Sequence, residues 1–151
     1  MAENHSRSIV KGATWRIVGT IDTIILSLIF TGKIGKALRI GGIELFTKIL
    51  LFWVHERIWM RLGFGIKKTM IDGAVHKEEQ HYRSIVKGIS WRIIGSIDTF
   101  WIALFVNRDS ATATQTAFYI VATEVVTKVT LFWLHERIWM RVKWGKDIAK
   151  N

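Results

Sequence analysis

The sequence predicts an all-α integral membrane protein with four transmembrane helices, built from two helical-hairpin repeats of parallel orientation. Three observations predict this class. Apolar segments recur four times, the chain holds two copies of one unit, and basic residues gather at the segment ends. Half of the 151 residues are hydrophobic, which is far too many for an intrinsically disordered chain.

Two copies of one unit divide the chain. The run RSIVKG at 7–12 recurs at 83–88, and HERIWMR at 55–61 recurs at 135–141. Repetition at this spacing indicates duplicated structural units. We therefore expect three parts: a first two-helix membrane repeat at 7–65, a polar cytoplasmic linker at 66–82, and a second two-helix membrane repeat at 83–145.

The apolar segments predict the four helices in order, at 17–31, 40–54, 93–106 and 116–134. Flanking Trp and Arg residues extend each segment to about 20 residues, the length that crosses ~30 Å of hydrocarbon. Within each segment, hydrophobic residues occupy all sides of the predicted helix, whereas a surface helix of a soluble bundle has a broad polar face. Tryptophans concentrate at membrane interfaces, and we expect four of them to be interfacial anchors: Trp15, Trp59, Trp91 and Trp139.

The net charge of +10 is distributed unequally about the predicted spans. Four spans place sixteen Lys and Arg residues at the termini and linker, and only Lys33, Lys36, Arg39 and Arg108 on the opposite side. The positive-inside rule then predicts that both termini and the linker are cytoplasmic. Both repeats should share one orientation, related by an axis along the membrane normal. These flanks suit the lipid bilayer and its anionic headgroups, and no nucleic-acid partner is expected.

Three ionisable positions recur inside the predicted spans of both repeats, which gives six residues. Buried charges in a bilayer are costly, so they normally face a bundle interior and find partners. They are candidates for a transport site or for a buried polar network that only fixes helix packing: Asp22, Glu44, Lys48, Asp98, Glu124 and Lys128. We expect Asp22 to meet Lys48, and these two with Asp98 and Lys128 to form one charge-balanced set near the axis between the repeats.

A second group of polar residues lies at the predicted cytoplasmic edge: Lys11, Arg16, His55, Glu56, Arg57, Lys87, Arg92, His135, Glu136 and Arg137. Here we expect Arg16 to approach Glu56, and Arg92 to approach Glu136. The HERIWMR run lacks the second His of the HExxH zinc pattern, so no metal site is expected. One His per repeat could supply two axial haem ligands. The adjacent Glu and Arg instead favour a hydrogen-bonded interfacial cluster, a gate or an anion contact, with no cofactor.

Motifs present in both copies carry a resemblance to a known family. They are KGxxWR followed by IDT, then ExxTK, then FWxHERIWMR. With these residues the chain resembles a bacterial family of predicted membrane proteins, domain of unknown function twenty sixty-one. The resemblance implies a multi-pass protein of the bacterial inner membrane and says little about activity. The association of some members with sulfate-assimilation enzymes implies handling of a sulfur oxyanion.

Two functions fit these observations. One is a channel or transporter for a small ion, namely a sulfur oxyanion, another anion or a proton, through a polar core between the repeats. Four helices leave little room for a pore, so this function favours a homodimer. The other is a structural or accessory protein that binds anionic lipid or a larger membrane complex without transport. We do not expect an enzyme, because the chain has no cysteine, no Ser–His–acid spacing and no phosphate-binding glycine loop.

Overall fold

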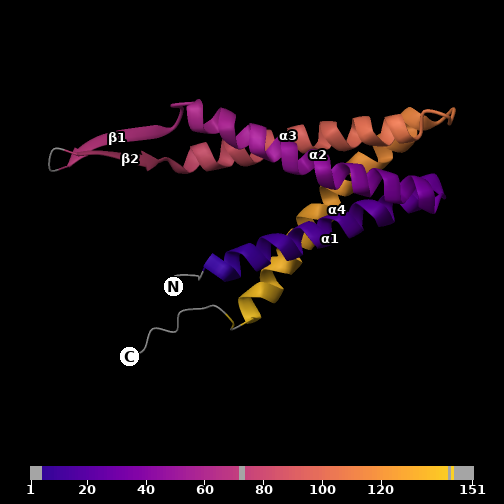
Figure 1. Ribbon diagram of the computed structural model, residues 1–151, viewed down its shortest axis with the longest axis horizontal. Helices are drawn as coiled ribbons and strands as arrows, with labels where there is room; N and C mark the ends of the chain where they lie inside the picture. The colour runs from indigo at the N-terminus through magenta and orange to yellow at the C-terminus, as the bar shows by residue number, and fades with distance from the viewer. Residues whose placement is uncertain (1–4, 72–73, 143, 145–151) are drawn as a thin grey trace. The chain divides into compact units, whose positions relative to one another are not determined.

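The computed structural model describes residues 5–71, 74–142 and 144, and within them four helices and one β-hairpin follow one another (Figure 1). Their order and bounds are α1 His5–Thr31, α2 Ile34–Arg61, β1 Ile66–Ile71, β2 Ala74–Glu79, α3 His81–Val106 and α4 Ala113–Arg141. The helices contain 27, 28, 26 and 29 residues, so each is longer than the roughly 20 residues that a membrane span requires.

Three of these helices are long and apolar enough to cross a membrane: Ser6–Thr31, His81–Val106 and Ala113–Arg141. We predicted four spans, and α2 meets the length but not the composition. The reason is its charge, because Arg39, Glu44 and Lys48 interrupt the apolar stretch of α2. The helical character of the predicted membrane segments is confirmed, whereas composition alone supports only three spans.

The chain forms two compact units, one from residues 1–45 and 99–151 and the other from residues 46–98. In the first unit, buried apolar side chains gather near the two short interhelical loops. Ile40 of α2, Ile102 of α3 and Ile120 of α4 belong to this core, and Phe30 of α1 packs against it. All four helices therefore contribute to one hydrophobic core in this unit.

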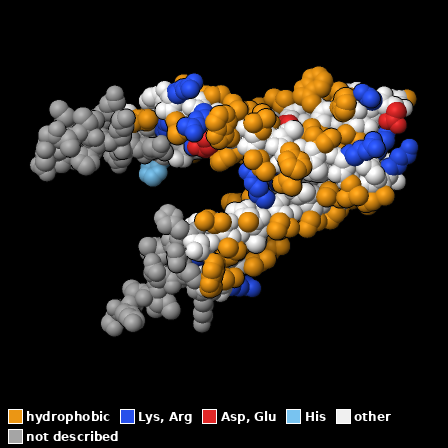
Figure 2. Space-filling view, in the orientation of Figure 1, with side chains coloured by type: hydrophobic (Ala, Val, Ile, Leu, Met, Phe, Trp, Pro, Cys, Tyr) orange, Lys and Arg blue, Asp and Glu red, His pale blue; other side chains and the backbone are white. Residues whose placement is uncertain are grey.

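Large apolar side chains face outward along the helices. On α1, Ile17, Ile21 and Ile25 are exposed at intervals of one helical turn. Figure 2 shows hydrophobic side chains (orange) spread over the visible surface of the described helices. A soluble bundle would bury such a surface, whereas hydrocarbon solvates it. The outward faces of the helices are therefore suited to lipid.

At Gly41, α2 packs closely against Ile24 of α1. A Cβ at this position would overlap Cγ1 of Ile24, whereas a Cβ at Gly42 would meet nothing within 4 Å. We expect Gly41→Ala to destabilise the protein by about 1–3 kcal/mol, because a packed interface must shift to accept the methyl group. Thermal unfolding in detergent measures this, with Gly42→Ala as the matched control. Equal melting temperatures for the two variants would contradict the close packing.

The second unit contains a hairpin that we did not predict in the linker at 66–82. β1 and β2 pair antiparallel, with Ile66 opposite Glu79 and Ile71 opposite Ala74. The sequence signal was the Asp-Gly dipeptide at 72–73 between two short runs, a pattern that favours hairpins. Gly65 precedes the hairpin with φ +69°, and its carbonyl accepts a hydrogen bond from the amide of Gln80 (2.9 Å). The linker thus folds back on itself between α2 and α3.

Candidate functional site

Arg7 shows that the helices pair across the repeats. Its guanidinium, almost completely buried, donates to the backbone carbonyls of Trp139 (2.7 Å), Val142 (2.9 Å) and Trp144 at the end of α4. It also lies 5.3 Å from the centre of the Trp139 ring. The last carbonyls of a helix lack intrahelical donors, and Arg7 supplies a donor at this end of α4. The first helix of repeat one is therefore fastened to the second helix of repeat two.

Arg83 makes the same contacts in the second unit. It donates to the carbonyls of Trp59 (2.6 Å), Leu62 (2.9 Å) and Phe64, and lies 5.3 Å from the centre of the Trp59 ring. The first helix of repeat two is therefore fastened to the second helix of repeat one. The two helix pairs, α1 with α4 and α3 with α2, have equivalent contacts.

The predicted cytoplasmic-edge residues form two equivalent clusters, one in each helix pair. In the first, Lys11 forms an ion pair with Glu136 (2.8 Å), and Trp139 Nε1 donates to His135 Nε2 (3.1 Å). Thr14 Oγ1 lies 3.0 Å from the same His135 nitrogen. Because the indole is only a donor, Nε2 must accept and Nδ1 carries the ring proton of the neutral imidazole.

The second cluster repeats these contacts on α3 and α2. Lys87 forms an ion pair with Glu56 (2.8 Å), and Trp59 Nε1 donates to His55 Nε2 (2.9 Å). Ser90 Oγ takes the place of the threonine, 2.9 Å from His55 Nε2. In both clusters the Nε2 lone pair is engaged by a tryptophan, which fits a hydrogen-bonded cluster.

The ionic partners in these clusters differ from those we expected. We expected Arg16 near Glu56 and Arg92 near Glu136, but the ion pairs that the structure shows for these glutamates are with Lys87 and Lys11. The arginines are half-buried on α1 and α3. Each lysine is five residues closer to the start of its helix, level with the glutamate near the end of the paired helix.

The tryptophans also correct one expectation. Trp59 and Trp139, expected as interfacial anchors, are 7% and 9% exposed because an arginine and a histidine cover them, so they offer little surface to lipid. Trp53 and Trp133 are 57% and 58% exposed instead. The other two expected anchors are half-buried and pack edge-on against phenylalanines, in the pairs Trp15–Phe132 and Trp91–Phe52. The remaining edge residues stack on the exposed rings, in the pairs Arg57–Trp53 and Arg137–Trp133.

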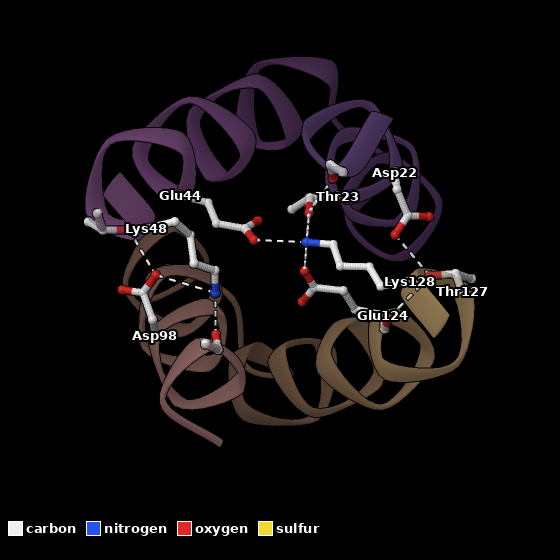
Figure 3. Close-up of polar contacts among 11 residues, drawn as sticks. Asp22, Thr23, Glu44, Lys48, Asp98, Glu124, Thr127 and Lys128 are labelled. Atoms are coloured by element: carbon white, nitrogen blue, oxygen red, sulfur yellow. Dashed lines mark hydrogen bonds and ion pairs between the residues drawn. The ribbon is translucent and has the colours of Figure 1, made fainter. Parts of the chain in front are cut away.

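The first unit holds a buried charged set around Lys128, near the middle of α4 (Figure 3). Lys128 Nζ lies 3.0 Å from Glu44 Oε1, forms a second ion pair with Glu124, and donates to Thr23 Oγ1 (3.1 Å). The side chains of Lys128, Glu44 and Glu124 are 12%, 6% and 7% exposed. One ammonium group therefore serves two buried carboxylates from different helices.

Asp22 adds a third carboxyl group in the same unit. It is buried on α1 and accepts a hydrogen bond from Thr127 Oγ1 (2.9 Å). Thr127 immediately precedes Lys128, so α4 presents a donor to the aspartate and a cation to the glutamates from adjacent positions. We call Asp22, Glu44, Glu124 and Lys128 the acidic core; it has three carboxyl groups and one ammonium group.

The equivalent lysine of the second unit is held differently. Lys48 Nζ lies 3.5 Å from Asp98 Oδ2 and donates to the Gly95 carbonyl, and Thr47 Oγ1 donates to the same Asp98 oxygen (2.8 Å) (Figure 3). We expected Lys48 to meet Asp22 of its own repeat. It pairs instead with the matching aspartate of the other repeat, because α2 packs against α3.

Several residues of these sites were not singled out from the sequence. Arg7 and Arg83 stand at the start of the repeated RSIVKG run, and Thr47 and Thr127 are the threonines of the repeated ExxTK motif. Repetition was thus the signal that could have identified all four. Thr23 belongs to the repeated IDT run in the same way.

The chemistry of the acidic core follows from the burial of its carboxyl groups. Carboxyl groups in a medium of low dielectric are poorly stabilised as anions unless a cation or proton neutralises them. Lys128 forms ion pairs with two of the three carboxyl groups, those of Glu44 and Glu124. Such a set is suited to binding and exchanging protons or small cations, and it repels anions.

Comparison with known proteins supports the repeat organisation. A family model described as "Predicted membrane protein (DUF2061)" matches residues 9–60 and 85–140. The two matched regions confirm two tandem copies of one unit and the resemblance found in the sequence. No curated protein and no solved structure matches the chain.

Proposed function

We propose that the chain, which belongs to the predicted membrane protein family DUF2061, moves protons across the bacterial inner membrane. The observation that carries the proposal is the acidic core. Its three carboxyl groups come from α1, α2 and α4, near the middle of each helix, and all three are buried. In the proposed topology this places protonatable groups at the depth where a proton pathway needs them.

In this proposal α2 is the fourth membrane span. With 28 residues it is long enough to cross the hydrocarbon. Its mid-helix charges have partners on other helices, Glu44 on α4 and Lys48 on α3. Arg39 lies near the start of α2, where a long side chain can reach the headgroup region. The charge of α2 is thus compatible with a span inside a bundle.

Both termini and the linker are cytoplasmic in the proposed topology, because most basic residues lie there. The expected result is that a cysteine placed at Lys67, which is exposed at the start of the hairpin, reacts with an impermeant maleimide only after the cells are opened. A cysteine at Asp109, in the exposed α3–α4 loop, should react in intact cells. The chain has no native cysteine to interfere. The reverse pattern would exclude this orientation.

A proton fits the acidic core better than the anions that the sequence analysis left open. A sulfur oxyanion or chloride passing this point would meet three carboxyl groups and one lysine that is already paired. Like charges in a low dielectric repel strongly. A proton instead neutralises one of the carboxylates and can move between them by hydrogen-bond exchange.

Ion flux in proteoliposomes tests the choice of ion. We expect the purified protein to accelerate proton movement while sulfate, sulfite and chloride fluxes stay at the level of protein-free liposomes. Anion flux without proton flux would replace this function with anion transport. No flux of any kind would favour the structural or accessory function, with the acidic core serving only to fix helix packing.

A further inference from the structure

The first unit contains an open pocket of about 240 Å³ at the opposite end of the helices from the histidine clusters. The end of α1, the start of α2, the α3–α4 loop and the start of α4 contribute to its wall. Its polar lining includes Lys33, Lys36, Asn107, Ser110, Thr112 and Thr116. The pocket has no role in the proton pathway proposed above.

The charge of this lining is positive. Lys33 and Lys36 both line the pocket, and Asp109 is the one carboxylate among its lining residues. Lys36 forms an ion pair with Asp109, and the hydrogen bond from Lys36 lowers the pKa of that exposed carboxyl group. The ion pair neutralises Lys36, so the ammonium of Lys33 supplies the net charge of the pocket.

The loop that forms one wall is held by its own hydrogen bonds. The buried side-chain amide of Asn107 donates from Nδ2 to the backbone carbonyl of Ala103 (2.8 Å). The backbone carbonyl of Asn107 accepts a hydrogen bond from the backbone amide of Ser110 (2.8 Å). Ser110 Oγ in turn lies 3.1 Å from Thr112 Oγ1. The hydroxyl groups of the pocket therefore stand on a fixed turn.

The start of α4 adds hydrogen-bond donors to the same wall. Thr112 is the N-cap residue and makes no side-chain capping hydrogen bond, and the first turn of α4 contains no acidic residue. The amide of Ala113 donates to the Ser110 carbonyl (3.2 Å), whereas the next amides of a helix lack intrahelical acceptors and carry partial positive charge. They complement the ammonium of Lys33 and the hydroxyl groups around it.

From this combination we propose that the pocket binds a small oxyanion of phosphate chemistry. Lys33 supplies the charge, and the hydroxyls of Ser110, Thr112 and Thr116 supply neutral donors to the anion's oxygens. The anion is either free in solution or the phosphate of an anionic phospholipid headgroup. Only the lipid source rests on the topology proposed above, in which these loops lie at the membrane surface. Binding of the anion itself is independent of proton transport.

The full chain is placed in phosphatidylcholine nanodiscs and titrated with inorganic phosphate. Calorimetry then measures binding of the free anion. In a second titration, phosphatidylglycerol incorporated in the nanodiscs replaces phosphate. Native mass spectrometry measures the bound lipid. The variant is Lys33→Gln. Its control is Arg108→Gln, which removes the same charge from the same side of the chain at a residue that packs on Phe105 and does not line the pocket.

We expect Lys33→Gln to weaken binding about tenfold or more, because a charge-assisted hydrogen bond is lost, and Arg108→Gln to change it less than about twofold. Loss of phosphate binding in the first titration identifies a free anion as the ligand. Loss confined to phosphatidylglycerol identifies the lipid headgroup. Absence of binding by the unmodified protein in both titrations, or equal weakening by the two substitutions, would overturn the proposal. Circular dichroism of both variants verifies that they are folded.

Discussion

Lys128→Met should destabilise the folded protein by about 3–5 kcal/mol, the range found when one partner of a buried ion pair is removed. Lys128 is the cation for Glu44 and Glu124, whose side chains are 6% and 7% exposed. Without it, both carboxyl groups lose this ion pair, and their charged forms become more costly in a medium of low dielectric. Unfolding in detergent, followed by circular dichroism against denaturant concentration, measures the change.

Lys48→Met is the matched control, because it makes the same change at the equivalent position of the other repeat. It should cost less than Lys128→Met. The ion pair of Lys48 with Asp98 is longer, at 3.5 Å, and Asp98 retains the hydrogen bond from Thr47 when the lysine is gone. Adding Glu44→Gln and Glu124→Gln to Lys128→Met should restore most of the lost stability. Equal cost for the two lysine substitutions, or no recovery, would contradict the asymmetry between the units.

Glu124→Gln should reduce the rate of proton movement in proteoliposomes more than about tenfold. The amide retains the size and hydrogen-bonding capacity of the side chain, but it cannot release and rebind a proton at physiological pH. We select Glu124 for this test because its carboxylate pairs with Lys128 and accepts a hydrogen bond from Thr23. A pH-sensitive dye inside the liposomes follows the rate.

Glu136→Gln is the control for this change, since it removes a carboxyl group from the same helix. Glu136 pairs with Lys11 near the end of α4, away from the acidic core, and its side chain is 33% exposed. We expect the proton flux of the Glu136→Gln variant to stay within about twofold of that of the unmodified protein. If both glutamine variants lose flux equally, the acidic core has no special role and the loss reflects a general defect.

The sequence allowed the prediction of the helices but not of their partners. Hydrophobic segments and repeated motifs located all four helices, but the observed helices are longer, and α1 and α3 each begin 12 residues before the predicted segment. The repetition that identified them also made the pairing ambiguous. Lys11, for example, could have paired with Glu56 of its own repeat or with the identical Glu136 of the other. Only packing distinguishes the two, and the structure pairs Lys11 with Glu136.

The difference between Lys48 and Lys128 could not be predicted for the same reason. Both follow the same ExxTK pattern, yet one lies between two glutamates and the other pairs with an aspartate. Repetition of the RSIVKG run marks Arg7 as a candidate, but the sequence does not show that its side chain donates to the backbone carbonyls of Trp139 and Val142.

The proton flux of the unmodified protein is the measurement that tests the central claim most directly. The protein is reconstituted into liposomes that carry a potassium diffusion potential, with an impermeant anion on both sides. We predict proton entry more than about tenfold faster than in protein-free liposomes, unchanged when chloride or sulfate replaces the impermeant anion. Proton entry no faster than in protein-free liposomes, or entry that requires a permeant anion, would contradict a proton pathway through the acidic core.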